Sequence, residues 1–330
     1  MSQTKDKGDI GDLPPKFCMH CGAPVADSKA SFCMICGESL QSSQPTLFSP
    51  SAGGSNISRE EPKVPANLDE IKYPTGISLV MPVVAFLFIA IIVVIIVFII
   101  LLTNPSLTLD FIETPEFLIA GLFLELFFIV PPFVYLRQYF PRKSTKLRLQ
   151  LLGLPLDVET RKKILPEVLI GLSVGFGLVF LVTGLQMFSE WLWSALFGPD
   201  FVAYGVNSFY NGSIENLTLN TLQLVLIWVA MFGAVGPSEE ILYRGFTQRG
   251  LIQSWGKSAG ILVTALLFTF AHIIPWIRPL ETIIVFFLPY FAISLLLGFM
   301  REWRKGNLLA NIIAHGFYNS LIITLAVLGF

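Results

Sequence analysis

Charged residues are scarce in this sequence. Asp, Glu, Lys and Arg make up 14% of the 330 residues, and hydrophobic residues make up 54%. Soluble globular domains carry roughly 25% charged residues, so the composition argues against an ordinary soluble fold and predicts an integral membrane protein. The formal net charge of −1 leaves no basic surplus, and we therefore expect no nucleic-acid partner.

Cysteine occurs only near the N-terminus. Residues 17–40 contain the repeat F-C-M-x-C-G twice, and a glycine follows each Cys-x-x-Cys pair. Two such knuckles supply four soft thiolate ligands, which suits tetrahedral zinc and predicts a small zinc ribbon that could bind a protein partner. The ligands of this structural zinc would be Cys18, Cys21, Cys33 and Cys36. A redox-active dithiol pair and a disulfide staple remain alternatives.

The N-terminal part of the chain also lacks an apolar run behind its first lysines, so we expect no cleavable signal peptide. Residues 1–16 are expected to be disordered. Residues 41–74 are rich in Ser, Pro, Gly and Asn and are expected to form a flexible linker. The remainder, 75–330, is expected to be a helical transmembrane domain, whose motif-bearing core is about 145–330.

Long apolar runs dominate this last region and predict an all-α polytopic membrane protein with about seven transmembrane helices. A span needs about 20 consecutive apolar residues. The predicted spans are 78–103, 116–136, 166–189, 218–248, 258–277, 281–300 and 307–329.

Lys and Arg are missing from alternate loops. Loops 104–115 and 190–217 carry acidic residues but no Lys or Arg, whereas 137–163 and the other alternate loops are basic, and only Arg278 departs from the pattern. The positive-inside rule therefore predicts a multi-pass protein of the cell membrane with a cytosolic N-terminus. The ribbon would then lie in a reducing compartment, where a structural disulfide is not expected.

Polar side chains are rare within the spans, because each charge costs ~2.5–3.5 kcal/mol to insert. Most gather in three spans, at Glu239, Glu240, Arg244, His272, His315 and Asn319; Glu125 is the lone charge of the second span. Measured from the nearest basic anchor at ~1.5 Å per residue, Glu239 and His315 lie at about 15 Å and His272 at about 22 Å. Such similar depths predict one shared site.

Spacing within each helix indicates how this site is divided. Glu240 and Arg244 are four residues apart and can pair, which leaves Glu239 as the freer carboxylate. A buried carboxylate near a neutral histidine is a plausible base for water. A second histidine and an amide are plausible donors to an oxyanion, so the set predicts amide hydrolysis. Four glycines should allow close approach of helices or substrate: Gly233, Gly236, Gly245 and Gly316.

The order of these motifs resembles a known family. E-E-x-x-x-R, F-x-x-x-H and H-x-x-x-N on successive functional spans resemble the CPBP intramembrane proteases, which include CAAX prenyl proteases and bacteriocin-processing enzymes. The resemblance covers about residues 145–330. The motif residues are Glu239, Glu240, Arg244, Phe268, His272, His315 and Asn319.

The resemblance implies a membrane endopeptidase that cuts near the C-terminus of a substrate or within a membrane-associated peptide. By motif position, Glu239 and His272 would activate water. His315 and Asn319 would stabilise the oxyanion, and the Glu-Arg pair would be structural.

Alternatives remain open at this point. The family has also been treated as metalloproteases, and Glu239, His272 and His315 offer a possible catalytic zinc site. The absence of H-E-x-x-H favours glutamate-activated water. A non-catalytic receptor, scaffold or peptide-sequestering immunity protein is a second hypothesis. A transporter is a third, although no inverted repeat and no helix break in the fourth span are visible.

Overall fold

The computed structural model describes the backbone of residues 16–17 and 24–25, and the chain over 71–140, 145–154, 164–211, 218–273 and 278–329. The chain divides into two compact units. One comprises Met1–Ile71 and Arg137–Thr145, and the other Lys72–Leu136 and Lys146–Phe330.

In the first unit, β1 (Lys16–Phe17) and β2 (Pro24–Val25) pair antiparallel, with Lys16 opposite Val25. These strands flank the first Cys-x-x-Cys in the sequence. The four cysteines of the predicted ribbon lie outside the described residues, as do residues 1–15 and nearly all of the predicted linker. The zinc ribbon and the predicted domain boundaries therefore stay predictions.

The second unit is helical throughout its described residues, which confirms the predicted fold class in outline. Six helices are long and apolar enough to cross a membrane. They are Thr75–Thr103, Pro115–Tyr139, Ile164–Phe197, Thr221–Trp255, Leu280–Trp303 and Leu309–Val327. The predicted fifth span, 258–277, corresponds to α11 (Lys257–His272), which has 16 residues and is therefore about 24 Å long. This helix is shorter than predicted and ends at His272.

The other helical elements have the following residue ranges, in chain order. α1 is Thr75–Thr103, η2 is Leu109–Glu113, and the second apolar segment contains α2 (Pro115–Leu124), η3 (Glu125–Ile129), α3 (Val130–Tyr135) and η4 (Leu136–Tyr139). α4 is Thr145–Leu151, α6 is Ile164–Phe197, α12 is Leu280–Trp303 and α13 is Leu309–Val327.

The predicted outer loop 190–217 is partly helical. α6 continues to Phe197, and α7 (Pro199–Tyr210) follows after Gly198, whose φ is +90°. Glycine adopts this φ without steric cost, and proline suits the first helical position. Val202 of α7 is buried in an apolar cluster, so packing turns a stretch that looks like a loop into a helix.

The fourth apolar helix changes pitch along its length. Its elements are α8 (Thr221–Ala230), η6 (Met231–Val235), α9 (Gly236–Glu239), η7 (Glu240–Gln248) and α10 (Arg249–Trp255). η6 and η7 are π-helical, a rare conformation that is frequent at functional sites. Pro237 lies between them and has no N–H to donate to the preceding turn. The span is continuous, as expected, but it is not the uniform helix that the sequence predicted.

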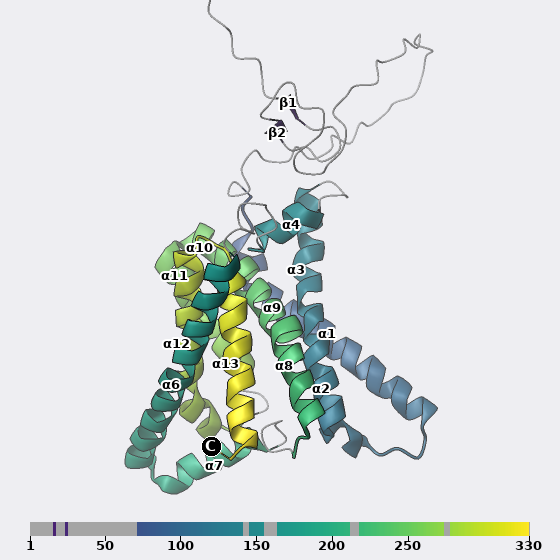
Figure 1. Cartoon of the computed structure of the whole chain (residues 1–330), viewed down its shortest axis with the longest axis vertical. Coiled ribbons are helices and arrows are strands. Elements are labelled where there is room, and N and C mark those ends of the chain that lie inside the picture. Colours follow the sequence, from purple (N-terminus) through teal and green to yellow (C-terminus); the bar gives the residue numbers. More distant parts are fainter. Residues whose placement is uncertain are drawn as a thin grey trace, which may run out of the picture. The chain divides into compact units, whose positions relative to one another are not determined.

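α13 packs directly on this irregular helix. It touches α8, η6 and α9 of that helix and also contacts α6 and α12, and Figure 1 shows it in yellow within the helical unit. A Cβ at Gly316 would lie 3.0 Å from the Met231 carbonyl oxygen, and a Cβ at Gly236 would lie 3.0 Å from that of Ile312. The two backbones therefore touch where the motif residues lie. At Gly233 a Cβ would meet nothing within 4 Å, so no described helix approaches closely there.

Candidate active site

Glu239 lies between the two histidines of the helical unit. Its Oε1 is 3.7 Å from His272 Nε2, and its Oε2 is 3.5 Å from His315 Nε2. The three side chains come from α9, α11 and α13. Glu239 is only 6% exposed, and its Oε2 has no hydrogen-bond partner among the described residues. The structure thus brings together three groups that the sequence placed at similar depth.

His272 is held by the main chain of its own helix. Its Nδ1 is 2.9 Å from the Phe268 carbonyl oxygen. A carbonyl oxygen can only accept, so Nδ1 carries a proton and Nε2 is the ring nitrogen directed toward Glu239. This bond involves only the main chain of residue 268. The Phe268 ring makes separate contacts: its centre lies 4.2 Å from that of the His272 ring and 4.4 Å from the Arg244 guanidinium.

His315 is held by the second glutamate. Its Nδ1 is 2.9 Å from Glu240 Oε1, so an ionised Glu240 accepts the Nδ1 proton and turns Nε2 toward Glu239. The adjacent acids thus face opposite edges of one imidazole. Sequence spacing paired Glu240 with Arg244 alone and did not reveal this contact, which joins residues 75 positions apart.

Glu240 and Arg244 form a fully buried ion pair. Arg244 Nη1 donates to Glu240 Oε1 at 3.0 Å, and both side chains are 0% exposed. Arg244 Nη2 donates to Ser294 Oγ at 3.0 Å, and the guanidinium lies 4.4 Å from the centre of the Phe268 ring. A buried ion pair is stable only when further bonds offset its desolvation. These contacts contribute to that offset, while Arg244 Nε is buried without a partner in the described structure. The predicted i,i+4 contact is present.

A cavity of about 230 Å³ lies beside this cluster, lined by residues that include His272, His315 and Asn319. A second cavity of about 460 Å³, between α6, α7, α12 and α13, shares four of its lining residues. The shared residues are Tyr290, Ile293, Tyr318 and Ile322. The site therefore adjoins further space toward the end of α6.

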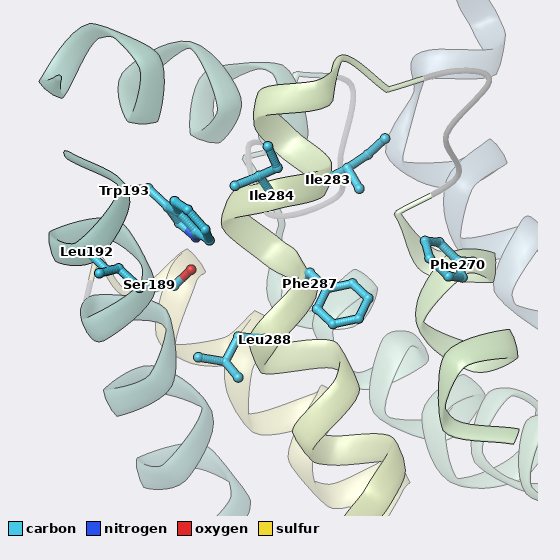
Figure 2. Close-up of a pocket in the computed structure, with 8 residues that line it drawn as sticks. All are labelled: Ser189, Leu192, Trp193, Phe270, Ile283, Ile284, Phe287 and Leu288. Carbon is cyan, nitrogen blue, oxygen red and sulfur yellow. The ribbon is translucent and has the colours of Figure 1, made fainter. Parts of the chain in front are cut away.

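Figure 2 shows a third cavity, of about 500 Å³, between the C-terminal part of α6, the end of α11 and the start of α12. Its described lining contains no acid, base, histidine or cysteine. Its one hydroxyl, on Ser189, donates to the Val285 carbonyl oxygen at 2.7 Å. Pro289 cannot donate to that carbonyl, so Ser189 satisfies an acceptor and is not a free nucleophile. This cavity lacks the groups for hydrolysis.

Two polar residues near the site fall outside the motifs. Asn311 Nδ2 donates to Glu240 Oε2 at 3.2 Å; its position four residues before His315 was the available signal. Glu125 is in η3, which packs against α9. Its Oε2 is buried without a partner in the described structure, and its carboxyl interacts electrostatically with Glu239. In the sequence, Glu125 stood out only as the lone charge of the second predicted span, and nothing there linked it to Glu239.

A catalytic zinc would require several ligand side chains to meet at one point. Nowhere in the described ranges are three or more His, Cys, Asp or Glu arranged so that they could hold a metal ion. Zinc ligands lie about 2.0–2.3 Å from one point. Glu239, His272 and His315 as they stand do not form such a group, and the ribbon cysteines lie outside the residues concerned.

Comparison with known proteins agrees with this location. Residues 221–321 are similar to the family described as Type II CAAX prenyl endopeptidase Rce1-like. This region is narrower than about 145–330, but it contains every motif residue. No curated protein matches the chain, and no solved structure matches it. The match supports a CAAX-type intramembrane endopeptidase in general terms, and the apolar helices fit an integral membrane protein.

Proposed function

We propose that the chain hydrolyses a peptide bond in a membrane-associated substrate with water activated by Glu239 and His272. The contrast between two neighbouring acids carries this proposal. Both Glu240 oxygens have partners, whereas Glu239 Oε2 has none in the described structure and lies at the site. A buried acceptor without a donor indicates a missing donor, and substrate water fits that description.

The distances favour water in this place. Separations of 3.5 and 3.7 Å between Glu239 and the two Nε2 atoms are too long for good direct hydrogen bonds. In the neutral tautomers all of these atoms are acceptors. One water molecule can donate to the Glu239 carboxylate and to His272 Nε2, which would orient its oxygen lone pair toward a substrate carbonyl.

The proposed reaction has two steps. The water oxygen bonds to the carbonyl carbon while its proton passes to Glu239 and the carbonyl electrons move onto oxygen. Asn319 donates an N–H to this oxyanion. Glu240 keeps the proton of His315 on Nδ1, as carboxylates do in other histidine dyads, so that Nε2 stays directed toward Glu239. The oxyanion collapses, the C–N bond breaks, and Glu239 returns the proton to the leaving amine.

For the substrate we propose a C-terminal peptide of the Cys-aliphatic-aliphatic-X type that carries a prenyl group. The family match to residues 221–321 and the adjoining cavity of about 460 Å³, whose lining is mostly aliphatic and aromatic, support this choice. Such a peptide also lies at the membrane surface by virtue of its lipid, where an intramembrane site can receive it.

The test uses the purified full chain in lipid nanodiscs and an internally quenched, farnesylated peptide of this type. We expect Glu239→Gln and His272→Ala to lower kcat/KM by about 10²–10⁴-fold, as expected for loss of a general base. Glu113→Gln changes an exposed acid in η2 and should leave the rate unchanged. Cleavage by Glu239→Gln at the parental rate would overturn the proposal, and loss of activity in a chelator would favour the metal alternative.

A further inference from the structure

Asn311 joins the site to the backbone of α12. Its Nδ2 donates to Glu240 Oε2 at 3.2 Å and to the Leu297 carbonyl oxygen at 2.7 Å. The residue is 0% exposed. Both amide protons therefore have acceptors, one on the carboxylate that binds His315 and one on a neighbouring helix.

The orientation of this amide follows from chemistry. The Leu297 carbonyl and an ionised Glu240 can only accept, so the reversed amide would place Oδ1 against two acceptors. In the observed orientation, Asn311 Oδ1 is buried without a partner among the described residues. A buried acceptor without a donor costs stability.

Asn311 restricts how Glu240 can turn. Glu240 Oε1 accepts from Arg244 and from His315, while Oε2 accepts from Asn311. The terminal torsion of a glutamate has broad, roughly two-fold preferences, so two bonds to one oxygen do not fix the carboxylate plane. A third bond to the other oxygen, from a group anchored on α12, does fix it.

The helix register places this contact one turn from the histidine. Asn311 and His315 are four residues apart on α13 and lie on the same face. Both contact the same carboxylate, one at each oxygen. A shift of the Glu240 carboxylate would therefore lengthen or bend its hydrogen bond with His315 Nδ1.

We propose that Asn311 is a positioning residue: it holds Glu240 so that His315 keeps its proton on Nδ1 and presents Nε2 to Glu239. The kinetic part rests on the proposed hydrolytic function, but the effect on the histidine tautomer does not. Loss of Asn311 should free the Glu240 carboxylate to rotate and should let His315 populate its other tautomer.

Gln248 provides a matched control. Its Nε2 donates to the Gly298 carbonyl oxygen at 3.0 Å, next to Leu297 on α12. It is also 0% exposed, and its Oε1 is also buried without a partner in the described structure. Gln248→Leu thus removes a comparable bond to α12, but no described contact joins Gln248 to Glu240.

The experiment compares Asn311→Leu, Asn311→Ala and Gln248→Leu with the parent, all as full chains in nanodiscs. The chain has three histidines, so ¹⁵N imidazole spectra can be assigned with His20→Gln and His272→Gln. We expect one Nδ1–H tautomer for His315 in the parent and in Gln248→Leu, and mixed tautomers in both Asn311 variants. The Ala variant retains the test if the Leu variant does not fold.

Cleavage of the farnesylated peptide supplies the second measurement. In the Asn311 variants we expect kcat to fall about 10- to 100-fold, the usual effect of losing a partner that orients a histidine, with little change in KM. An unchanged tautomer with kcat within about two-fold of the parent overturns the proposal. If the parent cleaves no such peptide, the proposed function fails while the tautomer spectra still decide the role of Asn311.

Discussion

The first and fourth apolar helices of the second unit differ in what surrounds them. In the most apolar 18-residue window of Thr75–Thr103, 6% of the residues are buried, against 39% in Thr221–Trp255. Figure 1 shows the C-terminal part of α1 leaning away from α2. Lipid is as apolar as leucine, so hydrophobicity alone does not draw helices together. The less apolar helix is the more closely packed of the two, and it carries the site.

Within the closely packed fourth helix, the largest effect is expected from changes to the buried Glu240–Arg244 ion pair. Arg244→Met leaves the Glu240 carboxylate buried without its cation, and removal of one partner of a buried pair typically costs ~3–5 kcal/mol. We expect a large loss of thermal stability and of activity. A Glu240→Gln/Arg244→Met double variant should regain part of the stability but not the activity, because the amide that replaces the Glu240 carboxylate offers His315 no charged acceptor. Thermal unfolding in nanodiscs would show both effects, and a stable single variant would contradict them.

Asn319 tests the oxyanion role within the same cavity. Removal of one oxyanion donor typically lowers kcat by about 10²–10³-fold. We therefore expect Asn319→Ala to lose kcat with little change in KM or in unfolding temperature. If only KM rises, Asn319 binds substrate and does not stabilise the oxyanion.

A glycine in close backbone contact with the fourth helix should tolerate substitution less well than a glycine with open space around it, and the expected loss of stability is smaller than for the ion pair. A Cβ at Gly316 would press on the Met231 carbonyl oxygen at 3.0 Å, whereas a Cβ at Gly177 of α6 would meet nothing within 4 Å. Gly316→Ala should lose ~1–3 kcal/mol through overpacking. Gly177→Ala should be neutral or gain up to about 1 kcal/mol from helix propensity. Equal effects in a thermal-shift assay would show that the contact at Gly316 can relax.

The smallest effect is expected on α1. The side chain of Ile95 is 51% exposed. Ile95→Ala should therefore change the free energy of unfolding by no more than about 0.5 kcal/mol, as for other residues outside packed regions. Thermal unfolding again provides the measurement. A loss of several kcal/mol would mean that this face has a protein partner.

The sequence predicted the elements that depend on local pattern. Apolar runs located six long helices, and i,i+4 spacing located the contact of Glu240 with Arg244. The pairing of Glu240 with His315 depends on how α13 packs against η7, and spacing along one helix carries no information about it. The π-helical segments and α7 likewise depend on Pro237, Gly198 and tertiary burial. Asn311 was missed because it belongs to no motif and its partners lie on other helices.

Single-turnover hydrolysis of the farnesylated peptide in H₂¹⁸O, with the intact mass of the chain measured during the turnover, tests the central claim most directly, because a covalent mechanism leaves an acyl adduct on the chain and direct attack by water does not. For the parent we predict one ¹⁸O in the new carboxylate, no covalent adduct in the intact mass of the protein, and almost no product with Glu239→Gln. An acyl adduct on the chain, or equal product from the Glu239→Gln variant, would show that Glu239 does not activate the attacking water.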